Sequence, residues 1–63
     1  MRSAYDIAVR SSFYYERRAE EIRTVAEATV DPWCRKVLAG IVEDYMRLAG
    51  DALNRERRER KAA

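Results

Sequence analysis

The chain has 63 residues, of which 48% are hydrophobic and 38% are charged, and its formal net charge is +2. A chain of this length forms one small domain that buries only about 60% of its unfolded surface, so it needs a disulfide, a metal or a partner chain for stability. A single cysteine excludes an internal disulfide, and the lack of histidine removes the commonest nitrogen ligand of zinc and di-iron sites. A partner chain is therefore the expected source of stability.

The same composition indicates where the protein resides. No stretch approaches the roughly 20 apolar residues that a membrane span requires. The first residues include Arg2, Asp6 and Arg10 and lack the continuous apolar segment of a secretory signal. We therefore expect a cytoplasmic protein with a reduced thiol and no membrane span.

The first helix is expected over about residues 4–29. Ser3 followed by Asp6 three residues later resembles an acidic capping box, which predicts a helix start near residue 4. Further along, apolar and small residues recur at alternating steps of three and four, the spacing of an inter-helix seam. They are Tyr5, Ala8, Ser12, Tyr15, Ala19, Ile22, Ala26 and Thr29.

A short turn at about residues 30–31 is expected to end this helix. Proline disfavours helical geometry in the residue before it, so Asp31 is a poor position for continuing the helix. Aspartate is a preferred N-cap, and proline is favoured at the first helical position. Asp31 and Pro32 therefore predict the start of a second helix.

The second helix is expected over about residues 32–58, with a basic tail over 55–63. Gly40 and Gly50 each cost a helix interior about 1 kcal/mol relative to alanine. Ala52 and Leu53 nevertheless stay in phase with the apolar residues before Gly50, which favours a continuous helix. The seam expected on this helix is Leu38, Ile41, Tyr45, Leu48 and Ala52.

Together these elements predict an all-α fold. Two long helices joined by a short turn lie antiparallel, and Val25, Val37, Val42 and Ala49 widen the apolar stripes to the breadth that a bundle requires. Residues 1–63 are expected to form one helical-hairpin domain that dimerises into a four-helix bundle. The residues expected to hold the hairpin together are Tyr15, Ala19, Ile22, Ala26, Leu38, Ile41, Tyr45 and Leu48.

The middle of the chain resembles a family of small uncharacterised alphaproteobacterial helical-hairpin proteins. It contains Y-E-R-R-A-E-E-I-R at residues 15–23, Asp31-Pro32, and Leu38 and Tyr45 followed by L-A at residues 48–49. These are similar to the family pattern Y-x-R-R-A-E-E-hydrophobic-R, D-P and hydrophobic-x6-Y-x2-L-A, over roughly residues 14–53. The resemblance implies a helical hairpin in a bacterial cytosol and carries no catalytic or ligand-binding residues. Trp33 and Cys34 replace residues that are more often polar in the family.

Carboxylates are the first candidates for chemistry. Paired acids are able to serve acid–base catalysis or a metal, but here they lie mostly on polar helix faces beside arginines at helical spacing. We interpret them as solvated ion-pairing faces. They are Glu16, Glu20, Glu27, Glu43 and Asp44.

Cys34 is the one candidate nucleophile. The first turn of the second helix and the neighbouring Arg35 and Lys36 favour its thiolate, but the chain has no histidine to act as a base. We interpret Cys34 as a buried or half-buried packing residue, with a redox-sensitive thiol or an intermolecular disulfide as the alternative. The chain is therefore predicted to be no enzyme and to use no cofactor or metal.

Positive charge is concentrated at the C-terminal end. Residues 54–63 hold five positive and two negative charges, which leaves eight positive and nine negative charges elsewhere. Glu56 and Glu59 interrupt the run, and cations suit a helix C-terminus, so a solvated helix end is the favoured interpretation. Salt-sensitive contact with an anionic partner is the alternative. The candidate contact residues are Arg55, Arg57, Arg58, Arg60 and Lys61.

The first 15 residues are apolar nearly all round. A single neighbouring helix cannot cover every side of such a segment, and contiguous exposed apolar surface marks an interface. We expect Tyr5, Val9, Phe13 and Tyr14 to contribute to an interface with a second copy.

The sequence therefore predicts a non-enzymatic interaction or scaffold protein that forms a homo-oligomer, most simply a dimer, and that is also able to bind another protein. The alternative is a small regulator that binds nucleic acid through the basic C-terminal helix end. The plasmid-copy-number RNA-binding protein Rop has the same dimeric hairpin architecture, an analogy of architecture with no shared motif.

Overall fold

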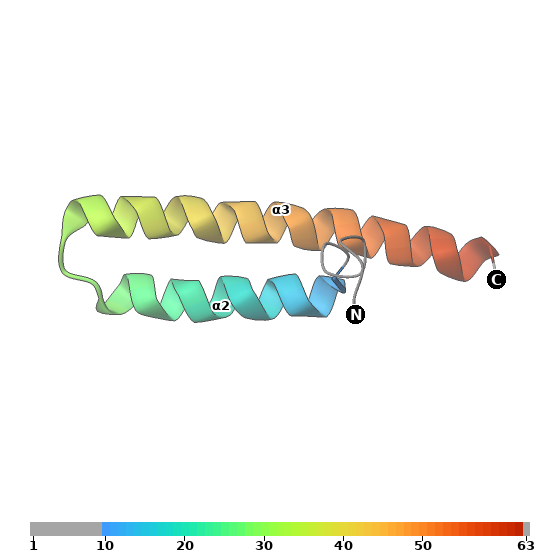
Figure 1. Ribbon diagram of the computed structural model, residues 1–63, viewed down its shortest axis with the longest axis horizontal. Helices are drawn as coiled ribbons and strands as arrows, with labels where there is room; N and C mark the ends of the chain where they lie inside the picture. The colour runs from blue at the N-terminus through green and yellow to red at the C-terminus, as the bar shows by residue number, and fades with distance from the viewer. Residues whose placement is uncertain (1–9, 63) are drawn as a thin grey trace, which may run out of the picture.

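The computed structural model describes residues 10–62, which form two helices. Helix α2 spans Ser12–Ala28 and helix α3 spans Pro32–Ala62. The two run antiparallel, side by side, as a hairpin (Figure 1). The described range contains no strand, so the expected all-α hairpin is confirmed there.

Helix α2 begins later than the sequence predicted. Residues 10 and 11 are not helical, and Ser11 is the N-cap, with φ −72° and ψ 159°. The Ser11 hydroxyl oxygen accepts a hydrogen bond from the Tyr14 backbone N–H at 3.2 Å, which pairs one of the amides that a helix start leaves free. A continuous helix over 4–29 is therefore corrected to one that starts at Ser12. The cap expected at Ser3 lies outside the described residues.

Three residues join the helices, and local hydrogen bonds fix both ends of this turn. At the end of α2, the Thr29 N–H donates to the Ala26 carbonyl at 3.2 Å. The Asp31 carboxylate accepts a hydrogen bond from the Cys34 N–H at 2.9 Å, which makes Asp31 the N-cap of α3. Pro32 is the first helical residue, the position that the sequence indicated.

Helix α3 is nearly twice as long as α2, with 31 residues against 17. It passes through Gly40 and Gly50 without interruption and continues to Ala62, beyond the expected end near residue 58. The basic tail is therefore part of the helix. Because α2 starts at Ser12, the last turns of α3 project beyond it (Figure 1).

The two helices pack along a stripe of small side chains. The fully buried residues of the described range are Ala19, Ala49 and Ala52, and no large side chain there is fully buried. Small side chains let the helices approach closely but remove little apolar surface from water. The shortest extent of the Cα trace is 13 Å, so the two described helices form a single layer.

The packed stripe of α3 differs from the predicted seam at one position. Leu48 is 42% exposed, whereas Ala49 is 4% exposed. The stripe therefore continues through Ala49 and Ala52, and Leu48 lies outside it. The other predicted seam residues are buried or half-buried: Tyr15, Ala19, Ile22, Ala26, Leu38, Ile41 and Tyr45.

Candidate interaction surfaces

The side chains considered for catalysis are not assembled into a site within residues 10–62. No group of three acidic, cysteine or histidine side chains is placed there to hold a metal ion, and no charged or polar residue is buried. Glu20 instead pairs with Arg23, and Asp44 lies 3.5 Å from the Arg47 guanidinium, each within its own helix. The candidate carboxylates are all exposed: Glu16, Glu20, Glu27, Glu43 and Asp44.

Cys34 is exposed, so its predicted role as a packing residue is wrong. What Cys34 contributes to the fold is its backbone N–H, which donates to the Asp31 carboxylate. This hydrogen bond holds the pKa of Asp31 below its usual value, because it stabilises the charged form.

Eight large apolar side chains of the described range are exposed on the outer surface. Phe13 is 67% exposed and Trp33 is 70% exposed, whereas the buried residues of the described hairpin are all alanines. The predicted interface residues Phe13 and Tyr14 are both accessible, and Tyr5 and Val9 lie outside the described residues. The exposed large apolar residues are Phe13, Tyr14, Val25, Val30, Trp33, Val37, Met46 and Leu48.

Aromatic rings link the two helices near the start of α2. The Tyr14 and Tyr15 rings meet edge to face at 5.4 Å between centroids, and Tyr15 lies 6.4 Å from the Tyr45 ring of α3. The Arg10 and Arg18 guanidinium carbons lie 5.2 Å and 5.9 Å from the centres of Tyr14 and Tyr45. Such contacts hold the rings in place, so Tyr14 is a positioned but accessible side chain beside Phe13.

Glu56 of α3 is hydrogen-bonded to the first residue of α2. Its carboxylate accepts hydrogen bonds from the Ser12 N–H at 2.9 Å and from the Ser12 hydroxyl at 2.8 Å. The Ser12 N–H, followed by its hydroxyl, keeps the pKa of Glu56 below its usual value. Glu56 therefore accepts a hydrogen bond from an amide at the start of a different helix.

Sequence reasoning assigned Glu56 to the basic run and missed this contact. The signal was present, because Ala49, Ala52 and Glu56 are spaced by three and four residues and so share the face toward α2. Ser12 was already on the predicted seam of the first helix.

Arg55 also links α3 to the residues before α2, and its side chain is only half-exposed. Its guanidinium donates to the Arg10 carbonyl at 2.7 Å, and its Nε lies 3.8 Å from the Glu59 carboxylate. Arg55 thus has partners within the hairpin, and its contact with an anionic partner stays a prediction. The other four predicted cations are exposed on the projecting end of α3: Arg57, Arg58, Arg60 and Lys61.

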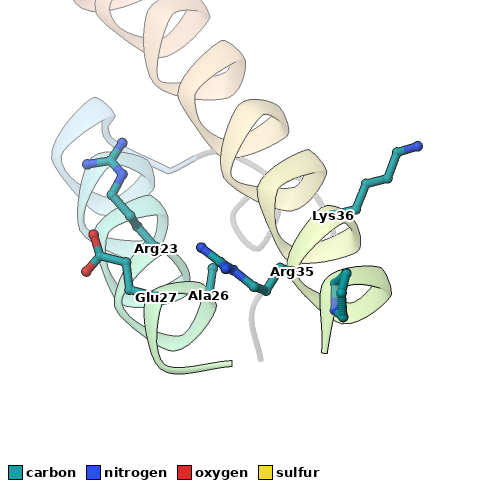
Figure 2. A pocket seen from close by; sticks show the side chains of 6 residues that line it. Arg23, Ala26, Glu27, Arg35 and Lys36 are labelled. Atoms are coloured by element: carbon teal, nitrogen blue, oxygen red, sulfur yellow. The ribbon is translucent and has the colours of Figure 1, made fainter. Parts of the chain in front are cut away.

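At the opposite end of the hairpin, a depression of about 420 Å³ lies beside the turn. Figure 2 shows Arg35 reaching toward α2, while Lys36 points away from it and the Glu27 carboxylate points outward. Since these charged groups do not converge, the depression gives no ligand a common binding point. It is lined by Arg23, Ala26, Glu27, Pro32, Arg35 and Lys36.

Neither α2 nor α3 contains an apolar stretch of the length and purity that crossing a bilayer requires. Comparison of the chain with protein-family models, with curated proteins and with solved structures finds no match. The resemblance of residues 14–53 to alphaproteobacterial hairpins therefore stays a prediction, and the surfaces themselves are the basis for a function.

Proposed function

We propose that this protein is a non-enzymatic interaction or scaffold protein that associates with a second copy of itself, so that four helices share one core. The observation that carries the proposal is that every buried residue of the described hairpin is an alanine, while its larger seam side chains are only half-buried. A fully buried large apolar side chain stabilises a fold by about 1.5–3 kcal/mol, and within residues 10–62 the hairpin buries none.

The exposed area supports the same proposal. The chain exposes 5284 Å², whereas a compact monomer of this mass exposes about 4,200 Å². The excess of about 1,100 Å² per chain reflects an elongated shape, and its size is comparable with the roughly 800 Å² that each partner contributes to a stable protein–protein interface. A second layer of helices is able to cover an excess of this size.

A second copy suits this surface better than a partner of strong charge. The net charge is only +2, so two copies repel each other weakly. The exposed apolar residues lie on both helices and in the turn, and they leave the two broad faces of a one-layer hairpin open. Two-fold symmetric dimers are the commonest way for a chain to cover such a face.

The setting we propose is the bacterial cytoplasm. The resemblance of residues 14–53 to alphaproteobacterial hairpins supports it, and so do the numerous charged side chains on the described helix surfaces.

Phe13→Glu tests the proposal by placing a charge on the surface offered for association. Sedimentation velocity at micromolar concentration is expected to give twice the chain mass of 7.4 kDa for the wild type and the single-chain mass for the variant. Val30→Glu is the matched control, because Val30 is an exposed apolar residue in the turn, and it is expected to retain the dimer mass. A folded wild type at the single-chain mass would contradict the proposal.

A further inference from the structure

The projecting end of α3 has a more uniform charge than its sequence suggests. Glu56 and Glu59 interrupt the basic run in the sequence, but the structure engages both carboxylates on one side of the helix. Glu56 accepts two hydrogen bonds from Ser12 of α2, and Glu59 lies 3.8 Å from the Nε of Arg55. The two negative charges therefore lie on the side of α3 that carries the contacts of Arg55 and Glu56.

Three of the four remaining cations gather on the other side. Residues 57, 58 and 61 fall within about 100° of the helix circumference, and position 56 lies outside this arc. Arg57, Arg58 and Lys61 are exposed, and none of them makes an ion pair or hydrogen bond with another residue of the range 10–62. We call these three side chains the tail face. Asn54 and Asp51 border it on the side toward the middle of α3.

We propose that the tail face binds the phosphate backbone of nucleic acid without reading its sequence. Arginine and lysine side chains bind phosphate oxygens through charge-assisted hydrogen bonds, which position a protein on a duplex but carry no base specificity. Because the last turns of α3 project beyond α2, an extended polyanion reaches the tail face without meeting the shorter helix (Figure 1).

The composition of the projecting end favours nucleic acid over the other polyanionic surfaces. Residues 54–62 contain no large apolar side chain. A helix that lies on a membrane buries an apolar face in the lipid, and a protein interface needs buried aromatic or aliphatic anchors. Phosphate contacts need only the cations.

Fluorescence anisotropy with a labelled DNA duplex of about 20 base pairs tests this proposal. Three phosphate contacts give a salt slope near 2.7, so the affinity of the wild type is expected to fall about 40-fold between roughly 50 and 200 mM NaCl. The variant Arg57→Glu/Arg58→Glu/Lys61→Glu is expected to lose binding at the lower salt concentration. Circular dichroism checks that its helix content equals that of the wild type.

Two further arms make the result specific. Arg17→Glu/Arg35→Glu/Lys36→Glu changes the net charge equally and replaces exposed cations outside the tail face. It is expected to keep the wild-type affinity within about threefold, because long-range charge effects are screened at these salt concentrations. Vesicles containing phosphatidylserine are expected to bind the wild type more weakly than DNA. The proposal is overturned if the wild type does not bind DNA, if the two triple variants weaken binding equally, or if vesicles bind more tightly than DNA.

Discussion

The most deeply buried positions of α2 and α3 differ from the most exposed ones in the size of their apolar residues. Toward the partner helix lie Ala19, Ala49 and Ala52, whereas Phe13 and Trp33 face outward. An ordinary small domain places its large apolar residues inside. The difference indicates that the buried alanines set how closely the helices approach, while several large apolar side chains that burial could stabilise lie outside.

The two ends of the hairpin are stabilised by hydrogen bonds between residues that differ in their separation along the sequence. At the turn, Asp31 and Cys34 are three residues apart, whereas at the open end Glu56 and Ser12 are 44 residues apart. The turn therefore depends on local sequence alone. The start of α2 depends also on the packing of α3 against it.

The largest effect within the hairpin is expected for Ala52→Leu. Ala52 has no exposed surface, so a larger side chain forces the helices apart and lowers the free energy of unfolding by about 1–3 kcal/mol. Chemical denaturation monitored by circular dichroism measures the change. Ala39→Leu, at an exposed position of the same helix, is the control and is expected to change stability by less than about 0.5 kcal/mol. Equal effects at both positions would show that the alanine stripe does not set the helix spacing.

A smaller gain is expected for Gly50→Ala on the outer side. A Cβ at this position would meet no atom within 4 Å, so alanine is expected to raise the free energy of unfolding by up to about 1 kcal/mol through its helix propensity. Thermal unfolding at a fixed protein concentration measures the gain. A loss of stability would contradict an open surface at Gly50 and would indicate that another chain packs against it.

The smallest effect is expected at the open end, where stability depends on pH. The pKa of Glu56 is lower in the folded chain than its usual value of 4.5, so its contribution is complete above that pH and is lost as the pH falls through the folded pKa. Glu56→Gln is expected to make the loss of stability at acidic pH less steep. Asp31 has a pKa lowered in the same direction, so part of the loss remains in the variant.

Urea denaturation at a series of pH values compares Glu56→Gln with the control Glu59→Gln. Glu59 is exposed and lies near Arg55 of its own helix. If the free energy of unfolding falls equally steeply at acidic pH in the wild type and in Glu56→Gln, the contact between Glu56 and Ser12 does not contribute to stability.

Local signals in the sequence predicted the helices and the turn. The pair Asp31 and Pro32 fixes a helix start through its own geometry, and three- and four-residue spacing placed Ala19 on the packed face. The start of α2 at Ser12 was missed because a capping signal at Ser3 and a continuous periodic pattern both favour a longer helix. The observed start is capped by Ser11 and is also held by a carboxylate from residue 56, a contact between distant positions.

The surfaces were predictable only in part. Periodicity placed Leu48 on the seam because it shares a broad apolar stripe with Ala49, and a two-helix hairpin is too narrow to cover both. The basic run was visible in the sequence, but its division into the engaged residues Arg55, Glu56 and Glu59 and the tail face depends on which side of α3 meets α2.

The measurement that tests the shared core most directly is the thermal unfolding of the wild-type chain over about a hundredfold range of protein concentration. The melting midpoint is expected to rise steadily with concentration, because unfolding of a dimer releases two chains. A cooperative transition whose midpoint stays constant over that range, in a sample that sediments as single chains, would contradict it.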